Sequence, residues 1–293
     1  MDKRRIAGAG RNAVWGKAAA TICVAILAFA VILAARHIQS AKPGGEGAGA
    51  PALEAQGYKL VFADDFDTLD LGSGDSKAHT WYSGVWFSPE EPEPTNISAN
   101  KSILSLTWSS AQGPADTSIT TLSRDKRKFK AWRYGYFEAR MRWEPVKGAW
   151  PAFWLIPVQD ATGQDIYNGT KRSGEIDVFE GQGEQPHTFF GTIHEWTNSH
   201  TDQASRNNAF QLPSDTDMSQ FHTYGALWTP GNITWYYDNR PLHSEPTPPI
   251  FDQQDFFMVL TMQEGRNWKN GDLSGVTAPR MTLNVDWVKV WQK

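Results

Sequence analysis

Three carboxylates within six residues carry the clearest chemical signal in this 293-residue sequence: Glu175, Asp177 and Glu180. On a β-strand Glu175 and Asp177 point to the same side, because successive side chains alternate between the two faces. Strict alternation would send Glu180 to the other face. One extra residue, absorbed as a β-bulge near Val178 and Phe179, returns it to the first face. We therefore predict a bulged strand that carries three carboxylates on one surface.

Carboxylates gathered on one surface favour acid–base chemistry, because like charges held together raise the pKa of at least one group. Retaining glycoside hydrolysis uses such a pair. An ionised carboxylate attacks the anomeric carbon, and a protonated one gives its proton to the leaving oxygen. Glu175 and Glu180 could fill these two roles, with Asp177 between them. The same spacing is also typical of an ordinary amphipathic strand with a solvated polar face, so the spacing alone does not decide.

Tryptophan is abundant, with 14 in the chain, and six recur near the acidic strand or at the ends of predicted strands. A flat apolar ring with one polar edge suits the face of a pyranose sugar, although tryptophan is also common in the core of a β-sandwich. Both interpretations therefore stay open for these residues. The six are Trp132, Trp143, Trp150, Trp154, Trp196 and Trp268.

From residue 58 onward the chain is organised in short segments of period-two alternation, rich in β-branched and aromatic residues and separated by Gly, Pro, Asn and Asp. This pattern predicts strands, and no long amphipathic helix is expected. Asp238 and Asn239 predict a hairpin turn. Residues 58–293 are therefore expected to form one all-β domain, an antiparallel sandwich or jelly roll. The predicted strands cover 103–108, 135–143, 174–180, 189–196, 221–228, 233–237, 256–262 and 282–291.

The first 57 residues have a different composition. Residues 18–35 carry no charge and follow a basic arm, residues 1–17, that contains five Lys or Arg. A helix of this length reaches roughly 27 Å, close to the ~30 Å thickness of a bilayer's hydrocarbon core. The length favours a transmembrane signal anchor over a cleaved signal peptide, and the basic flank predicts a cytoplasmic N-terminus. Residues 36–57, rich in Gly, Ala and Pro, are expected to be a flexible linker.

Cysteine content and charge exclude several classes of protein. The single cysteine, Cys23, lies in the uncharged run, so the chain has neither an intrachain disulfide nor a metal site of several thiolates. The net charge of −4 divides into +4 before residue 58 and −8 after it, which disfavours nucleic-acid binding. Six basic residues between 124 and 133 could contact an anionic polysaccharide, but a solvated hairpin rim is favoured.

After residue 57 the sequence resembles glycoside hydrolase family 16, in its laminarinase-like form. Two motifs carry the resemblance: GEIDVFE at 174–180, which has the bulged E-x-D-x-x-E form of the family signature, and GAWPAFW at 148–154. An isolated E-x-D-x-x-E would be weak evidence, but an ordered set of matches between residues 58 and 291 is strong. The supporting matches are VFADDFD at 61–67, YGYFEAR at 134–140, TIH at 192–194, FHTY at 221–224, WYYD at 235–238 and VDWVKV at 285–290.

The resemblance implies a concanavalin A-like β-jelly-roll sandwich with a long substrate cleft across its concave sheet. It also implies endo-acting, retaining hydrolysis of β-glycosidic bonds, with β-1,3- or mixed-linkage glucan as the first expected substrate. Carried over by position, Glu175 would be the nucleophile and Glu180 the general acid/base, with Asp177 tuning the pair. Trp150 and Trp154 would line the subsites beside the cleaved bond.

Other positions are implicated less sharply. His194 could hydrogen-bond the acid/base or the substrate, or could be a structural histidine. The segment with Gln263, Asn267 and Trp268 falls where the family places glycone-side contacts, although it departs from the family's usual Gly-rich sequence. Asp286 matches a position that often helps to hold a structural calcium in the family, and a surface aspartate without an ion fits equally well. No other cofactor is expected.

These expectations combine into a monomeric polysaccharide hydrolase, held in the inner or plasma membrane through residues 18–35. Its catalytic domain would be exported to the periplasm or the outside, or secreted if the segment is cleaved. One alternative is depolymerisation or transglycosylation of a galactan or a self-made exopolysaccharide. Another is a non-catalytic carbohydrate-binding sandwich, which the loss of one acid would indicate, yet all three acids are present. A metal-dependent hydrolase is weaker, because none of the seven histidines forms a ligand-spaced pair.

Overall fold

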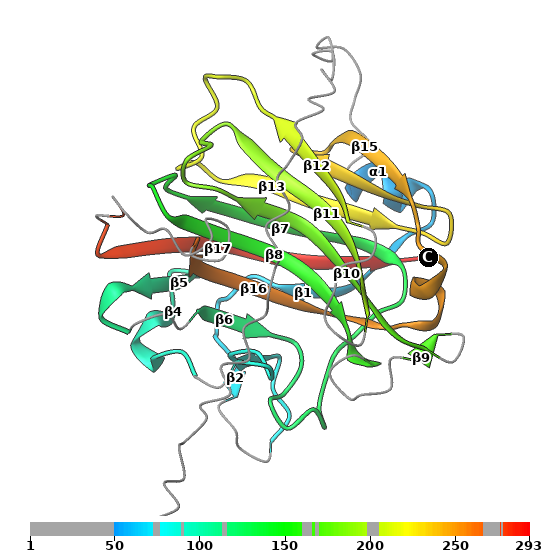
Figure 1. The fold of residues 1–293 in the computed structure, drawn as a ribbon, viewed down its shortest axis with the longest axis horizontal. Helices are drawn as coiled ribbons and strands as arrows, with labels where there is room; N and C mark the ends of the chain where they lie inside the picture. The colour runs from blue at the N-terminus through cyan, green and yellow to red at the C-terminus, as the bar shows by residue number, and fades with distance from the viewer. Residues whose placement is uncertain are drawn as a thin grey trace, which may run out of the picture.

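Two large β-sheets, packed face to face, make up the molecule (Figure 1). The computed structural model describes residues 50–72, 77–88, 91–112, 116–159, 166–167, 170–197, 205–265, 276 and 278–293. Strands of the two sheets run in broadly similar directions, as expected for an aligned sandwich. All described strand pairs are antiparallel except β2 with β3. The prediction of an all-β sandwich is confirmed.

The first sheet has eight strands in the order β15-β14-β13-β7-β17-β5-β4, with β1 paired to β17. Two 3-10 helices, η1 (Pro94–Asn96) and η2 (Ser110–Gln112), flank β4 and β5 along the chain. The strands are β1 (Lys59–Asp64), β4 (Ile97–Asn100), β5 (Ile103–Ser109), β7 (Gly135–Trp143), β13 (His222–Trp228), β14 (Asn232–Tyr237), β15 (Arg240–Pro246) and β17 (Arg280–Gln292).

The second sheet has nine strands in the order β12-β11-β10-β8-β16-β6-β3-β2, with β9 paired to β10. A third 3-10 helix, η3 (Pro249–Gln253), precedes β16. The strands are β2 (Leu71–Gly72), β3 (Trp81–Ser83), β6 (Thr117–Thr120), β8 (Ala149–Pro157), β9 (Ile166–Tyr167), β10 (Thr170–Gly181), β11 (Thr188–Thr197), β12 (Arg206–Gln211) and β16 (Phe256–Glu264).

The strongest sequence patterns correspond to real strands. All eight predicted segments lie on β5, β7, β10, β11, β13, β14, β16 and β17, with ends that shift by a few residues. The predicted hairpin turn is also confirmed: Tyr237 pairs with Arg240, and Asp238 and Asn239 both have positive φ, at 45° and 62°. Two left-handed residues between paired strands match the twist of an antiparallel hairpin.

The sequence pattern does not predict the central strand β8, although this strand contains most of the GAWPAFW motif. It lies between β10 and β16, and eight of its nine residues are buried. Phe153 and Leu155 face the core, while Trp150 and Trp154 occupy the alternate positions on the other face. Because both faces of this strand are covered by large apolar side chains, the period-two pattern that reveals half-buried strands is missing.

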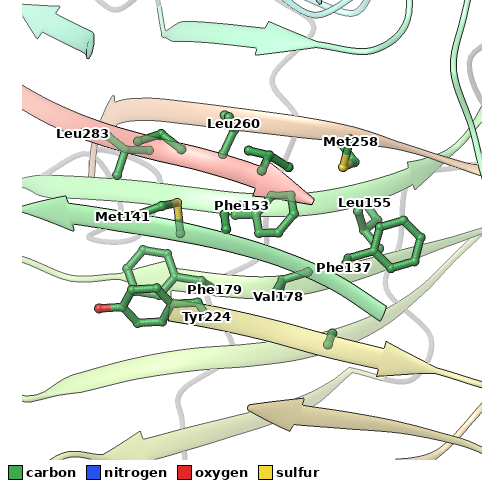
Figure 2. Close-up of a cluster of buried hydrophobic side chains, with 14 of the residues drawn as sticks. Phe137, Met141, Phe153, Leu155, Val178, Phe179, Tyr224, Met258, Leu260 and Leu283 are labelled. Atoms are coloured by element: carbon green, nitrogen blue, oxygen red, sulfur yellow. The ribbon is translucent and has the colours of Figure 1, made fainter. Parts of the chain in front are cut away.

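The core lies between the two sheets. Phe137, Met141, Tyr224 and Leu283 from the eight-stranded sheet meet side chains of β8, β10 and β16 from the nine-stranded sheet (Figure 2). All of these side chains are fully shielded from solvent. The side chains that they meet, also labelled in Figure 2, are Phe153, Leu155, Val178, Phe179, Met258 and Leu260.

A short helix precedes the first strand. Helix α1 (Ala50–Ala55) lies in the segment expected to be linker, and its Leu53 is buried against Tyr136, Tyr236 and Trp291 on the outer face of the eight-stranded sheet. Glu54 accepts a hydrogen bond from the Trp291 indole at 3.0 Å. Within the described residues, no helix is long and apolar enough to span a membrane. The predicted anchor at 18–35 lies outside those residues.

Candidate active site

Strand β10 contains the predicted bulge. Asp177 and Glu180 are three residues apart, but their Cα partners on β11, Thr192 and Phe190, are only two apart. The register with β8 shifts at the same place, between Asp177 and Phe179. Val178 and Phe179 both contribute to the core, so two consecutive side chains point inward. The bulge therefore brings Glu180 to the outward face that Glu175 and Asp177 already share.

Indole donors hold the two glutamates. Trp196 donates its Nε1 hydrogen to Glu175 Oε2 at 2.7 Å, and Trp150 donates its own to Glu180 Oε1 at 3.1 Å. The Thr192 hydroxyl contacts Glu180 Oε2 at 3.4 Å. Donors aimed at carboxylate oxygens fix the side-chain rotamers and stabilise the ionised forms.

Asp177 lies between the two glutamates and contacts His194. The distance from His194 Nε2 to Asp177 Oδ2 is 3.2 Å, and the imidazole stacks on the Trp196 ring at a centroid distance of 4.9 Å. Trp235, from the eight-stranded sheet, donates its indole hydrogen to the backbone carbonyl of Asp177 at 2.8 Å. The bulge is thus tied to the opposite sheet through the core.

Burial dominates the electrostatics of the site. It raises the pKa of Glu180 to about 8 and the pKa of Glu175 well above its usual range, and the charge of Asp177 adds to both shifts. His194 and the indole donors lower both pKa values but do not cancel the effect of burial. Three neighbouring carboxyl groups in such a place cannot all be ionised, so the site retains a proton near neutral pH.

Most of the predicted site residues are brought together on this face. Trp154 is the register partner of Asp177, and its indole donates to the Thr261 hydroxyl on β16 at 3.0 Å. Gln263 is the register partner of Trp150, one strand further from the carboxylates. Asn267 and Trp268, also predicted as substrate contacts, lie outside the described residues.

Comparison with known proteins identifies the family. The model of glycosyl hydrolases family 16 matches residues 91–289, which is more than half of the chain. The chain belongs to this family. It is therefore a glycoside hydrolase, and the resemblance seen in its motifs is confirmed.

Curated relatives of this family-16 chain include three bacterial enzymes. A β-glucanase of Rhodothermus marinus is 26% identical over 258 residues, which cover 82% of this chain and 87% of the relative. Two endo-1,3-1,4-β-glycanases of Rhizobium meliloti, ExsH and EglC, are 27% and 30% identical, again over 82% of this chain. The matched region spans only 53% of each Rhizobium protein.

Solved structures of the family share the fold. The catalytic domain of an endo-1,3-β-glucanase (laminarinase) from Thermotoga petrophila aligns with a TM-score of 0.63 and 22% identity, covering 80% of this chain and 98% of that domain. The endo-β-1,3-glucanase of Pyrococcus furiosus aligns with a TM-score of 0.61, also at 22% identity, covering 80% of this chain and 94% of that chain. At this identity the likeness establishes the jelly-roll fold and nothing finer.

Three residues around the family-16 carboxylates were not assigned contacts from sequence: Thr192, Trp196 and Trp235. Trp196 could have been found, because it lies two residues after His194 on a strand and therefore shares its face. Thr192 follows from the same alternation. Trp235 has no such signal, since its contact with Asp177 crosses from one sheet to the other.

Metal binding has limited support in this family-16 domain. Asp286, for which the sequence leaves a calcium ligand and a surface aspartate without an ion as alternatives, forms an ion pair with the Arg140 guanidinium, which is a poor setting for a cation ligand. Among the described residues, one group could offer three ligand atoms to a metal: Glu175, Asp177 and His194, whose atoms lie within 4.8 Å of one another. This group coincides with the carboxylate site and does not include Asp286.

The basic segment at 124–133 serves the fold in part. Arg124 donates to the backbone carbonyls of Val85 and Ser88 at 3.0 and 2.9 Å and pairs with Glu91 at 3.3 Å. Arg133 pairs with Asp255 at 2.9 Å. These contacts hold neighbouring loops and give these two cations a structural role that needs no anionic ligand.

Proposed function

We propose that this glycoside hydrolase is an endo-acting, retaining β-glucanase for β-1,3- or mixed-linkage glucan, with Glu175 as nucleophile and Glu180 as general acid/base. The main observation in support is the bulged strand β10. It brings Glu175, Asp177 and Glu180 to one buried face, where an indole donates a hydrogen bond to each glutamate. Retaining hydrolysis requires two neighbouring carboxyl groups of which one is ionised and one protonated, and a buried site that retains a proton near neutral pH suits this state.

In the first step Glu180 supplies the proton. Burial raises the pKa of Glu180 to about 8, so this group can hold the proton of the site at neutral pH and give it to the glycosidic oxygen as that bond breaks. Glu175 attacks the anomeric carbon and forms a glycosyl ester. Trp196 donates to Glu175 Oε2, which leaves Oε1 as the attacking oxygen and stabilises the ionised form.

In the second step Glu180 acts as a base. It takes a proton from a water molecule whose oxygen attacks the anomeric carbon, and the Glu175 carboxylate leaves. Esterification of Glu175 has meanwhile removed one negative charge from the site, which lowers the pKa of Glu180 and favours its basic form. The neighbouring charge of Asp177 contributes to the raised pKa of both glutamates.

The substrate class rests on the named activities of relatives. The β-glucanase of Rhodothermus marinus and the two Rhizobium meliloti glycanases support a β-glucan with 1,3 or mixed linkages. A keratan-sulfate endo-1,4-β-galactosidase of Sphingobacterium multivorum, 24% identical over 87% of this chain, supports a galactan as the alternative. Transglycosylation would use the same two carboxylates with a sugar in place of water.

Release of reducing ends from a panel of polysaccharides tests the proposal. Laminarin, lichenan, agarose, carrageenan and bacterial exopolysaccharides are offered to the wild type and to Glu175→Gln and Glu180→Gln. We expect wild-type release of short oligosaccharides from laminarin or lichenan and almost none from either variant. Activity on agarose alone would replace glucan by galactan, and full activity in a folded variant would overturn the residue roles.

We also propose that residues 18–35 anchor the enzyme in the inner or plasma membrane, with the hydrolase domain exported. The uncharged run after a basic arm supports this topology. Fractionation of cells that make the full chain, with and without residues 18–35, provides the test. Membrane association that depends on residues 18–35 is expected. Full-length protein that stays in the cytosol would contradict the anchor.

A further inference from the structure

A fourth carboxylate, outside β10, lies near the carboxylate site. Asp116 immediately precedes β6, and Gln263 lies beside it on β16, because Met262 is the register partner of Thr117. With its amide nitrogen turned toward Asp116, Gln263 donates to both carboxylate oxygens at 3.0 Å. The two side chains therefore form a closely matched pair between two strands.

Alternation places this pair on the face of the carboxylate site. The Thr117 hydroxyl donates to the backbone carbonyl of Thr107 in the opposite sheet at 2.8 Å, so Thr117 faces the core. Its neighbour Asp116 then faces away from the core. Met262 likewise belongs to the core, which turns Gln263 outward.

The pair continues a row that begins at the acid/base. Trp150 donates to Glu180 Oε1, Gln263 is the register partner of Trp150, and Asp116 accepts from Gln263. Adjacent strands are ~4.8 Å apart, so Asp116 on the β6 side lies roughly 10 Å beyond Trp150 on β8. A polysaccharide that crosses β8 and β16 from the carboxylates would reach Asp116 with a sugar unit that is not cleaved.

The chemistry of the pair suits sugar hydroxyl groups. Burial raises the pKa of Asp116 to about 7, and the charge of Glu264 adds to the shift. Gln263 is neutral, so it orients the Asp116 carboxyl group by hydrogen bonds alone. Each carboxylate oxygen can accept a further hydrogen bond, and the Gln263 carbonyl oxygen adds another acceptor.

We propose that Asp116 and Gln263 form a hydroxyl-binding pair for a sugar unit of the glucan chain remote from the cleaved bond. The Asp116 carboxylate accepts hydrogen bonds from hydroxyls of that sugar, and Gln263 holds the carboxylate in place. Asp116 is thereby a specificity-determining residue: it favours glucan chains that are long enough to reach it and whose hydroxyls are oriented toward it. This inference rests on the proposed β-glucanase function.

Steady-state kinetics of Asp116→Asn separate remote binding from chemistry. The substrates are a long β-glucan and the shortest aryl oligoglucoside that the wild type still cleaves. We expect about a tenfold rise in KM on the long glucan with kcat unchanged, and no change in kcat/KM on the short one, because binding lost equally from ground and transition states raises KM alone. Gln263→Ala should act in the same direction, while Asp215→Asn, at an exposed position, serves as the matched control.

Calorimetry with the inactive Glu175→Gln variant gives a readout that does not depend on turnover. Long glucan oligosaccharides should bind about tenfold more weakly when Asp116→Asn is added. Equal affinity with and without Asp116→Asn would overturn the inference, as would an equal fall in kcat on both substrates. Failure of the wild type to cleave any β-glucan would instead overturn the proposed function, and weaker binding in the calorimeter would still support the pair.

Discussion

Two regions of the sandwich bury glutamates with raised pKa values, and they differ in what surrounds the carboxyl group. Glu138 lies on β7, on the outer face of the eight-stranded sheet, and burial raises its pKa to about 7. It accepts a hydrogen bond from the Tyr136 hydroxyl at 2.8 Å and has Lys289 as its register partner. At the carboxylate site, burial raises the pKa of Glu180 to about 8.

The comparison shows that a raised pKa alone does not mark chemistry. Glu138 sits with a phenol and a lysine, and the nearby Asp238, whose charge adds to the raised pKa of Glu138, is itself paired with His222 at 2.8 Å. Glu180 shares its face with Asp177 and Glu175, so ionisation of any one group changes the others. Three carboxyl groups on one face can provide both an acid and a nucleophile, whereas the partners of Glu138 hold a single glutamate in the fold.

Amide substitution should separate the two regions most strongly. Glu180→Gln removes the acid/base, and we expect a loss of about 10²–10⁴ in kcat on polymeric glucan. Glu175→Gln, which removes the nucleophile, should lose at least as much. Glu138→Gln should retain wild-type kcat, because Gln still accepts from Tyr136. Circular dichroism establishes folding in each variant, and loss of activity in folded Glu138→Gln would break the comparison.

The pH profile should reflect the coupled site. Above about pH 8 Glu180 is deprotonated before it can act as an acid, so kcat/KM should fall roughly tenfold for each further pH unit. Glu138→Gln should leave this alkaline limb where it is. If the alkaline limb moved with Glu138→Gln but not with substitutions on β10, Glu138 and not Glu180 would control it, and the comparison would be contradicted.

Removing one indole donor should have a smaller effect. The Trp196 hydrogen bond lowers the pKa of Glu175, so Trp196→Phe should raise that pKa, move the acid limb of the profile to higher pH and cost about tenfold in kcat/KM at neutral pH. Trp154→Phe is the matched control, because its indole donates to Thr261 and not to a carboxylate. An acid limb that shifts equally in both variants would contradict the role of the donor.

The smallest effect is expected on the pH dependence of stability, through the titration of Glu138. Its folded pKa of about 7 lies above the unfolded value, so the folded state binds the extra proton, and stability is lost as pH rises from about 4.5 through 7. The loss is at most about 3 kcal/mol. Glu138→Gln should flatten this dependence in urea unfolding measured at pH 5 and pH 8. If the free energy of unfolding of Glu138→Gln changed with pH as in the wild type, groups other than Glu138 would cause the dependence.

Much of the sandwich could be predicted from the sequence, because one face of most strands is buried and the other is polar. The bulge on β10 followed from the requirement that Glu180 share a face with Asp177. Strand β8 escaped period-two analysis because both of its faces are covered. The anchoring of Asp177 by Trp235 could not be foreseen, since it depends on how the two sheets stack.

The contacts of Asp116 show the same limit. Its neighbour Thr117 begins a strand of four buried residues, and nothing in that segment signals that Gln263, far along the chain, lies beside it. Pairing of β6 with β16 is a long-range property of the sheet. The local sequence pattern identified the carboxylates that lie together on β10. It did not identify Asp116, which reaches the same face from the start of β6.

The anomeric configuration of the first product tests the central claim most directly. Proton NMR, recorded during rapid cleavage of a β-glucan oligosaccharide and before mutarotation, distinguishes the two anomers. Double displacement through Glu175 with Glu180 as acid/base predicts that the β anomer appears first. Initial appearance of the α anomer would contradict the account, because it would mean that water attacks in a single step and that Glu175 forms no ester.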